Sequence, residues 1–196
     1  MTRLRSTSVR RSWRSALAGV ALLVAAAFPT VVSAVTPVCN GLAPTIVGQP
    51  GETAIRGTQG PDVIVALEPG VRVDGRGGDD TICTGAGDNI INGGAGNDWI
   101  NGGDGANTID GGSGDNTMSA GSGNDIILGG IGNDTVSAGD GDNLVSTGAG
   151  DDVIVTGSGN DRIDGAKGYD TCDGGGGLNY VGHCEASPAI GNGAPS

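Results

Sequence analysis

The chain has 196 residues, a formal charge of −12 and 41 glycines, but only two tryptophans, two tyrosines and one phenylalanine. Abundant glycine without a strict three-residue period excludes collagen, and so few large side chains argue against a conventional globular core. The acidity argues against nucleic acid and anionic membranes as partners and favours cations.

Residues 1–34 are typical of a secretory signal peptide. Arginines precede an apolar run from Ala16 to Phe28, and Val32-Ser33-Ala34 places short residues where a signal peptidase cuts. The run is short for a transmembrane helix, so we expect no integral membrane segment in the mature chain; an N-terminal anchor is the alternative. Arg10-Arg11 leaves the twin-arginine route open beside the Sec route. Cleavage near Ala34 would remove five of the ten basic residues and leave a secreted, extracellular chain with a charge of about −17.

A nine-residue repeat begins at Gly48 and continues in phase for fifteen units, to Gly182, without insertion or deletion. The unit Gly93–Asn101 shows the pattern most clearly, with glycine at positions one, two and four, aspartate at six and an aliphatic residue at eight. The first three units, here called the worn units, match this pattern less closely than the others. We divide the chain into a signal peptide, a cap with the first worn repeat, a repeat domain, and a cap with a flexible tail, at residues 1–34, 35–56, 57–182 and 183–196.

The in-phase aliphatic residues predict a solenoid. Position eight is β-branched in thirteen of the fifteen units, as suits a half-buried strand. One unit cannot bury enough surface alone, so units must stack, with two short strands closing one turn in eighteen residues. A flexible glycine-rich linker is the alternative, but it predicts no fixed phase for isoleucine and valine.

This pattern resembles the RTX (repeats-in-toxin) family of secreted bacterial toxins, proteases and lipases, here as a stand-alone secreted form. The resemblance covers residues 57–182 and implies an all-β, right-handed parallel β-roll that binds several Ca²⁺ ions. It also implies that the ligands are turn carbonyls and the position-six side chains of units n and n+2 on one side of the roll.

Carried over to this chain, position six forms two rows, one on each side of the roll. The first row is Asp62, Asp80, Asp98, Asn116, Asp134, Asp152 and Asp170. The second row is Thr53, Val71, Asn89, Asn107, Asp125, Asn143, Asp161 and Asn179. The candidate metal ligands are all seven residues of the first row, together with Asp125 and Asp161 of the second.

The two rows differ in charge. Four gaps in the first row lie between two aspartates, whereas no gap in the second row has more than one. Because calcium affinity rises with the number of charged ligands, we expect tight binding along the first row and weak or no binding along the second. There the asparagine amides could form a neutral hydrogen-bonded ladder. For any single aspartate, the alternative is an Asx-turn in a glycine loop.

The same spacing predicts folding on metal binding. Neighbouring rungs lie about 4.8 Å apart, where two carboxylates repel by about 1 kcal/mol in water and about 3–4 kcal/mol at an effective dielectric constant near 20. A thin core cannot overcome a row of such repulsions, so we expect disorder without calcium. The aspartates at position five, including Asp79, Asp115 and Asp151, are interpreted as solvated charge.

Four cysteines in an exported chain suggest two disulfides. Cys172 and Cys184 flank the last unit, which favours a local bridge, and Cys39 would then pair with Cys83; this is one of three possible pairings. A zinc site is the alternative, but there is no C-x-x-C motif and His183 is the only histidine.

No catalytic motif is present, so we expect a protein that is not an enzyme. The first interpretation is a secreted, monomeric calcium-binding β-roll with a structural or envelope-associated role. The alternative is a calcium-dependent adhesion module that uses a solenoid face to bind a cell surface or glycan. Position three carries no regular Thr/Asn array, which disfavours ice binding.

Overall fold

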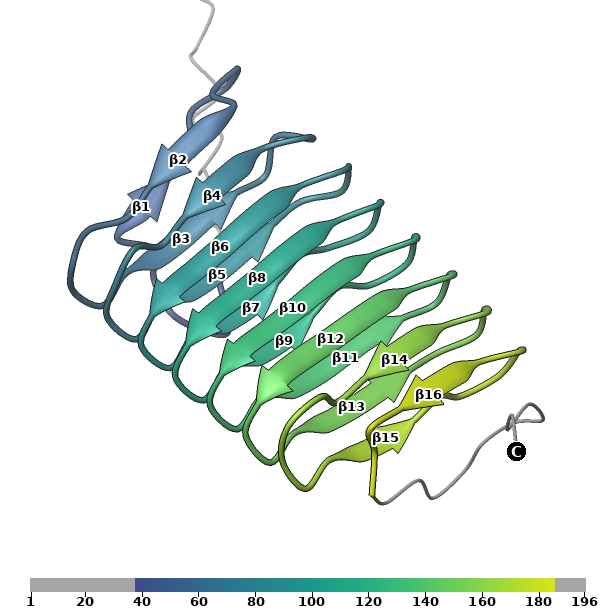
Figure 1. Cartoon of the computed structure of the whole chain (residues 1–196). Helices are drawn as coiled ribbons and strands as arrows, with labels where there is room; N and C mark the ends of the chain where they lie inside the picture. The colour runs from purple at the N-terminus through teal and green to yellow at the C-terminus, as the bar shows by residue number, and fades with distance from the viewer. Residues whose placement is uncertain (1–37, 186–196) are drawn as a thin grey trace, which may run out of the picture. The chain divides into compact units, whose positions relative to one another are not determined.

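The computed structural model describes residues 38–185, so the expected signal peptide and most of the expected tail lie outside the described residues. Within this range the chain winds into a coil whose sixteen short strands alternate between two parallel sheets (Figure 1). Residues 38–185 contain no helix that is long and apolar enough to cross a membrane. The predicted all-β parallel β-roll is confirmed.

The odd-numbered strands form one sheet and the even-numbered strands form the other. The first sheet contains β1 (Ile46–Val47), β3 (Val63–Ala66), β5 (Thr81–Thr84), β7 (Trp99–Asn101), β9 (Thr117–Ser119), β11 (Thr135–Gly139), β13 (Val153–Thr156) and β15 (Thr171–Asp173). The second contains β2 (Ala54–Arg56), β4 (Arg72–Asp74), β6 (Ile90–Ala95), β8 (Thr108–Ser113), β10 (Ile126–Ile131), β12 (Leu144–Ala149), β14 (Arg162–Asp164) and β16 (Tyr180–Gly182).

Position eight supplies the core, as the periodicity predicts. Ile64 pairs with Ile82, and Ile82 with Ile100, so equivalent residues of one sheet are eighteen residues apart. These three side chains have no exposed surface, and each buried isoleucine contributes about 1.5–3 kcal/mol. Along most of the roll, each strand contributes one large apolar side chain to a core shared by the two sheets. The core therefore gains little stability from each coil.

The worn units keep their place in the coil. Val71 stands at position six where later units have aspartate or asparagine, yet it is buried, and its N–H donates to Asn89 Oδ1 of the next coil over 3.1 Å. The strand that follows, β4, pairs in register with β2 and β6. Loss of the polar residue at position six therefore leaves the backbone of the roll intact.

Both predicted disulfides are confirmed. Cys39 bonds to Cys83 and ties the lead-in to β5, and Cys172 bonds to Cys184 at the opposite end. The lead-in begins with a tight turn in which Cys39 and Leu42 exchange backbone hydrogen bonds. The two bridges thus connect each end segment to the nearest coils.

Candidate metal centres

Each position-six row lies along the edge of a sheet at which its strands begin. Each first-row residue directly precedes a strand of the odd-numbered sheet, as Asp80 precedes β5, and each second-row residue precedes an even-numbered strand, as Asn89 precedes β6. All the polar residues of both rows from Asp62 onward are buried. The predicted separation of the rows is therefore correct, and both rows point inward.

One side-chain oxygen of each residue forms a ladder along the row. In the first row, Asp80 Oδ1 accepts the N–H of Asp62 over 2.8 Å, and Asp98 Oδ1 accepts the N–H of Asp80 over 2.8 Å. In the second row, Asn107 Oδ1 accepts the N–H of Asn89 over 3.1 Å. The pattern continues through Asp170 and Asn179. Because aspartate and asparagine share this bond, Oδ1 does not distinguish them.

The second atom of the side chain distinguishes the two residue types. Asn107 Nδ2 donates to the carbonyl oxygens of Gly103 and Gly105, over 3.0 and 2.9 Å. Asn143 Nδ2 donates to the equivalent carbonyls of Gly139 and Gly141, and Asn116 Nδ2 to that of Gly114. The second side-chain atom thus enters a cradle of turn carbonyls. This corrects the expected amide ladder, since the Nδ2 groups bond to turn carbonyls and only Oδ1 continues along the row.

In the aspartate units an oxygen takes the place of this N–H group. A Cβ placed on Gly129 would lie 2.5 Å from Asp134 Oδ2 and 2.6 Å from the carbonyl oxygen of Thr147. A Cβ on Gly111 would lie 2.9 Å from Asn116 Nδ2 and 2.7 Å from the carbonyl oxygen of Gly129. The two side chains therefore fill equivalent places. In the aspartate unit, a carboxylate oxygen and a carbonyl oxygen both border this place.

Seven aspartates of the described chain have a buried Oδ2 atom without a hydrogen-bond partner. They are Asp80, Asp98, Asp134, Asp152 and Asp170 of the first row, and Asp125 and Asp161 of the second. All seven are at most 2% exposed. Buried polar atoms nearly always have partners, so these oxygens require either a proton or a cation.

Burial also raises the pKa of these carboxyl groups. Desolvation is the largest cause, and it raises the pKa of Asp80 to about 7 and those of Asp98 and Asp134 to about 6, from an ordinary value of 3.8. The same cause raises the pKa values of Asp125 and Asp170. Nearby carboxylates, including Asp98 beside Asp80, raise them further. Negative charge is therefore unfavourable in these cradles unless a cation neutralises it.

The family model for the RTX calcium-binding nonapeptide repeat, four copies long, matches residues 56–91, 74–109, 84–118, 110–145, 119–154 and 146–181. The chain belongs to this family. A search of curated proteins gives no match. RTX repeats bind calcium, and the aspartate rows of this roll agree with that chemistry.

The cradles of this RTX chain fit calcium, a hard cation that prefers carboxylate and carbonyl oxygens. Within residues 38–185, no three His, Cys, Asp or Glu side chains converge as a ready-made metal cluster. An ion in a cradle would thus be held by backbone carbonyls together with one or two carboxylates. The spacing of the sequence indicated the carboxylates but not which carbonyls lie beside them.

Two predicted ligands already have hydrogen-bond partners for the second side-chain atom. Asp62 Oδ2 accepts hydrogen bonds from the N–H and hydroxyl of Thr58, over 2.7 and 2.9 Å. Asn116 Nδ2 donates into its own cradle. The gap between Asp62 and Asp80, expected to be among the strongest, therefore has only one unpartnered carboxylate oxygen. A threonine at position two was the sequence signal for this difference.

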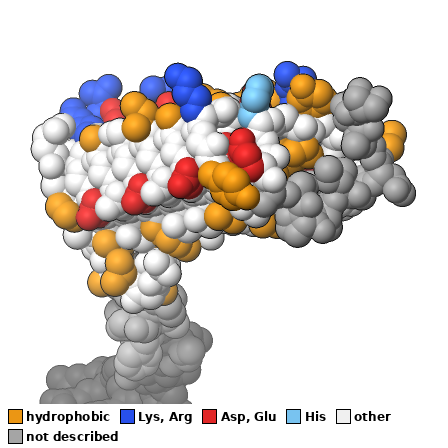
Figure 2. Space-filling model, turned by 60° about the horizontal axis from the view of Figure 1, so that its bottom comes forward, with side chains coloured by type: hydrophobic (Ala, Val, Ile, Leu, Met, Phe, Trp, Pro, Cys, Tyr) orange, Lys and Arg blue, Asp and Glu red, His pale blue; other side chains and the backbone are white. Residues whose placement is uncertain are grey.

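The exposed position-five row was incompletely predicted. Its carboxylates are not merely solvated, because Asp79 Oδ1 accepts the N–H of Asn97 over 2.8 Å and Asp115 Oδ1 accepts that of Asn133 over 2.7 Å. This ladder runs in the opposite chain direction from that of position six. Figure 2 shows acidic side chains recurring along one edge of the roll. These exposed residues stabilise the turns while keeping water contact.

We expect the metal-free chain to gain strand structure as the pH falls from 7.5 to 5. The folded pKa values of Asp80, Asp98 and Asp134 lie above the ordinary 3.8, so the folded state binds more protons than the unfolded chain between these values. This stability is present at low pH and is lost as the pH rises through about 6 to 7. Far-UV circular dichroism of chelating-resin-treated protein measures it; strand content that rises with pH would contradict the assignment.

Replacing Gly129 with alanine should weaken calcium binding and lower the stability of the calcium-loaded roll by about 1–3 kcal/mol. The added methyl group would collide with Asp134 Oδ2 and with the backbone of Thr147. Gly60→Ala is the matched control, because a Cβ there meets no atom within 4 Å. Thermal melts in calcium measure both variants. Equal melting temperatures would show that position one does not border the metal cradle.

Proposed function

We propose that this chain is a secreted, non-catalytic, calcium-binding β-roll that folds when it meets calcium outside the cell and then has a structural or envelope-associated role. The observation that carries the proposal is the set of seven buried carboxylate oxygens without partners. The described residues from 38 to 185 are occupied by the repeats and the two end segments that close them. Residues 1–34 support export through their signal-peptide pattern.

The unpartnered oxygens support calcium along both rows, but unequally. Five of the seven lie in the first row, and the asparagines at 89, 107 and 143 of the second row donate amide hydrogens to turn carbonyls or to a neighbouring hydroxyl. Thr156, at position one of the unit that contains Asp161, also has a buried hydroxyl oxygen without a partner. We therefore assign five cradles to the first row and two to the second.

Calcium titration of residues 35–196, followed by native mass spectrometry, tests the proposal. The expected result is a folded monomer that binds up to seven ions, with the majority taken up first and tightly. Magnesium serves as the control cation, because its small size and strict octahedral preference suit carbonyl cradles poorly. A chain that binds no calcium, or binds magnesium equally well, would overturn the proposal.

An apolar patch on the second sheet favours adhesion as a second candidate function. Ile126 and Leu144 pair in register on β10 and β12, and they are 42% and 41% exposed, with Leu128 close by at 43%. Substituting these three residues with serine should abolish calcium-dependent retention on cell-envelope or glycan preparations if this face mediates adhesion. Unchanged retention would exclude the face.

A further inference from the structure

The last coil of the roll is closed by three residues that lie beyond the repeats. The N–H of Gly165 donates to the carbonyl oxygen of Gly182 over 3.1 Å, so the eighteen-residue register extends to residue 183. The chain then takes a shorter path. Glu185 donates its N–H to the carbonyl oxygen of Asp170 over 3.0 Å, and its Oε2 accepts the N–H of Asp170 over 2.7 Å.

Glu185 thus replaces the missing position-six residue of the next coil. Inside the first row, the N–H of Asp152 donates to Asp170 Oδ1 over 2.9 Å, and that of Asp134 donates to Asp152 Oδ1 over 2.7 Å. The N–H of Asp170 makes the equivalent bond to a glutamate from the end segment. The longer glutamate side chain reaches this place from a backbone position three residues earlier in the register.

His183 replaces the missing position-one carbonyl. A Cβ placed on Gly165 would contact the carbonyl oxygen of His183 and would lie 2.5 Å from Asp170 Oδ2. The same pair of atoms, one carbonyl and one carboxylate oxygen, surrounds Gly129 in the interior of the row. Asp170 has no exposed surface, and its Oδ2 has no hydrogen-bond partner. The terminal cradle therefore has the same composition as the interior ones.

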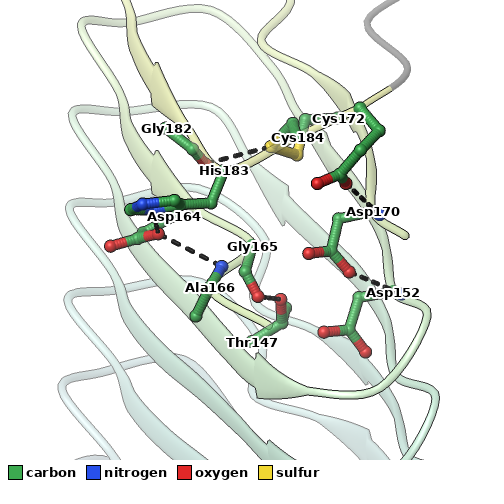
Figure 3. Close-up of a disulfide and its surroundings, with 11 residues drawn as sticks. Thr147, Asp152, Asp164, Gly165, Ala166, Asp170, Cys172, Gly182, His183 and Cys184 are labelled. Atoms are coloured by element: carbon green, nitrogen blue, oxygen red, sulfur yellow. Dashed lines mark hydrogen bonds and ion pairs between the residues drawn. A yellow bond between two sulfur atoms is a disulfide. The ribbon is translucent and has the colours of Figure 1, made fainter. Parts of the chain in front are cut away.

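The end segment is fixed in place by its neighbours. Figure 3 shows the Cys172–Cys184 disulfide beside Asp170, which lies above Asp152 on successive coils. His183 Nδ1 lies 2.7 Å from Asp164 Oδ1, and the backbone of His183 has a positive φ of 50°. This conformation is uncommon outside glycine, so the local contacts must maintain it. Cys184 is bonded directly between the two residues that complete the cradle.

We propose that Glu185 and the His183 carbonyl, which lie beyond the nonapeptide repeats, complete the calcium site of Asp170, the last of the five first-row sites. The inference rests on the proposed function, since it assumes that calcium occupies the interior cradles. Glu185 supplies a second carboxylate at a position where the repeat has ended. The Cys172–Cys184 disulfide positions that carboxylate, so the last site joins the end segment to the roll.

Glu185→Gln tests the site, because the glutamine oxygen can still accept the N–H of Asp170 while the negative charge is lost. Native mass spectrometry at a calcium concentration that just saturates the wild type should show one ion fewer. Glu68→Gln, which makes the same chemical change near the other end of the roll, should retain the full number. Glu185→Asp should recover the ion at higher calcium concentrations.

The possible outcomes separate the two proposals. A wild-type chain that binds no calcium contradicts the proposed function. A wild type and a Glu185→Gln variant that bind the same number of ions with the same affinities overturn the terminal site alone. A thermal melt in calcium checks that the variant is folded; if Glu185→Gln does not fold, Asp170→Asn replaces it, and loss of no ion in that variant overturns the terminal site.

Discussion

Addition of excess EGTA at pH 7.5 to the calcium-loaded chain is expected to abolish most of the strand signal in far-UV circular dichroism, and addition of calcium should restore it. Each buried polar atom without a partner costs about 1–3 kcal/mol, so the seven Oδ2 atoms together cost about 7–21 kcal/mol. Domains of this size are stable by about 5–15 kcal/mol. Because the two quantities are of the same size, we expect the metal-free roll to unfold at neutral pH.

The two disulfides should remain intact during this experiment, so the unfolded chain keeps both covalent links. Titration with magnesium after EGTA treatment controls for a general effect of ionic strength, and it should not restore the strand signal. A spectrum that EGTA leaves unchanged would contradict the claim that calcium is required for folding.

Replacing four first-row aspartates with asparagine should give a roll that folds without calcium. The asparagine amide would donate to the turn carbonyls, as Asn107 and Asn143 already do in the second row. Each substitution replaces a buried carboxylate oxygen that has no hydrogen-bond partner with an amide group that can form a hydrogen bond worth about 1 kcal/mol. The variant combines Asp80→Asn, Asp98→Asn, Asp134→Asn and Asp152→Asn.

The expected result is a strand signal in EGTA close to that of the calcium-loaded wild type, together with about four fewer bound ions at saturation. The matched control makes the same change of charge in the exposed position-five row. It combines Asp79→Asn, Asp115→Asn, Asp142→Asn and Asp151→Asn. This control should still unfold in EGTA. If both variants behave alike, net charge and not the cradle decides folding.

The architecture was predictable because one residue in nine has a fixed structural role. The isoleucines and valines at position eight are buried when successive units alternate between two sheets, and Ile64, Ile82 and Ile100 lie in this way. The same phase places position six directly before each strand. Each position-six aspartate could therefore be assigned to its row from the nine-residue period alone.

The partners of individual oxygens could not be read from the spacing. Position six appears equivalent in every aspartate unit, yet Thr58 supplies both hydrogen bonds to Asp62 Oδ2, and Asp80 Oδ2 has none. The count of paired carboxylates along the first row likewise ended at Asp170. Glu185, which accepts the N–H of Asp170, lies outside the nine-residue register and was therefore missed. These differences depend on side-chain length and on the direction of turn carbonyls, which periodicity does not define.

The most direct test of the account is the position of calcium along the two rows. A crystal structure of residues 35–196 grown in calcium, with an anomalous difference map, locates each ion. We predict peaks beside the Oδ2 atoms of the five unpartnered first-row aspartates, and none beside the amide groups of Asn89, Asn107 and Asn143. Peaks of equal height in aspartate and asparagine cradles would contradict the account.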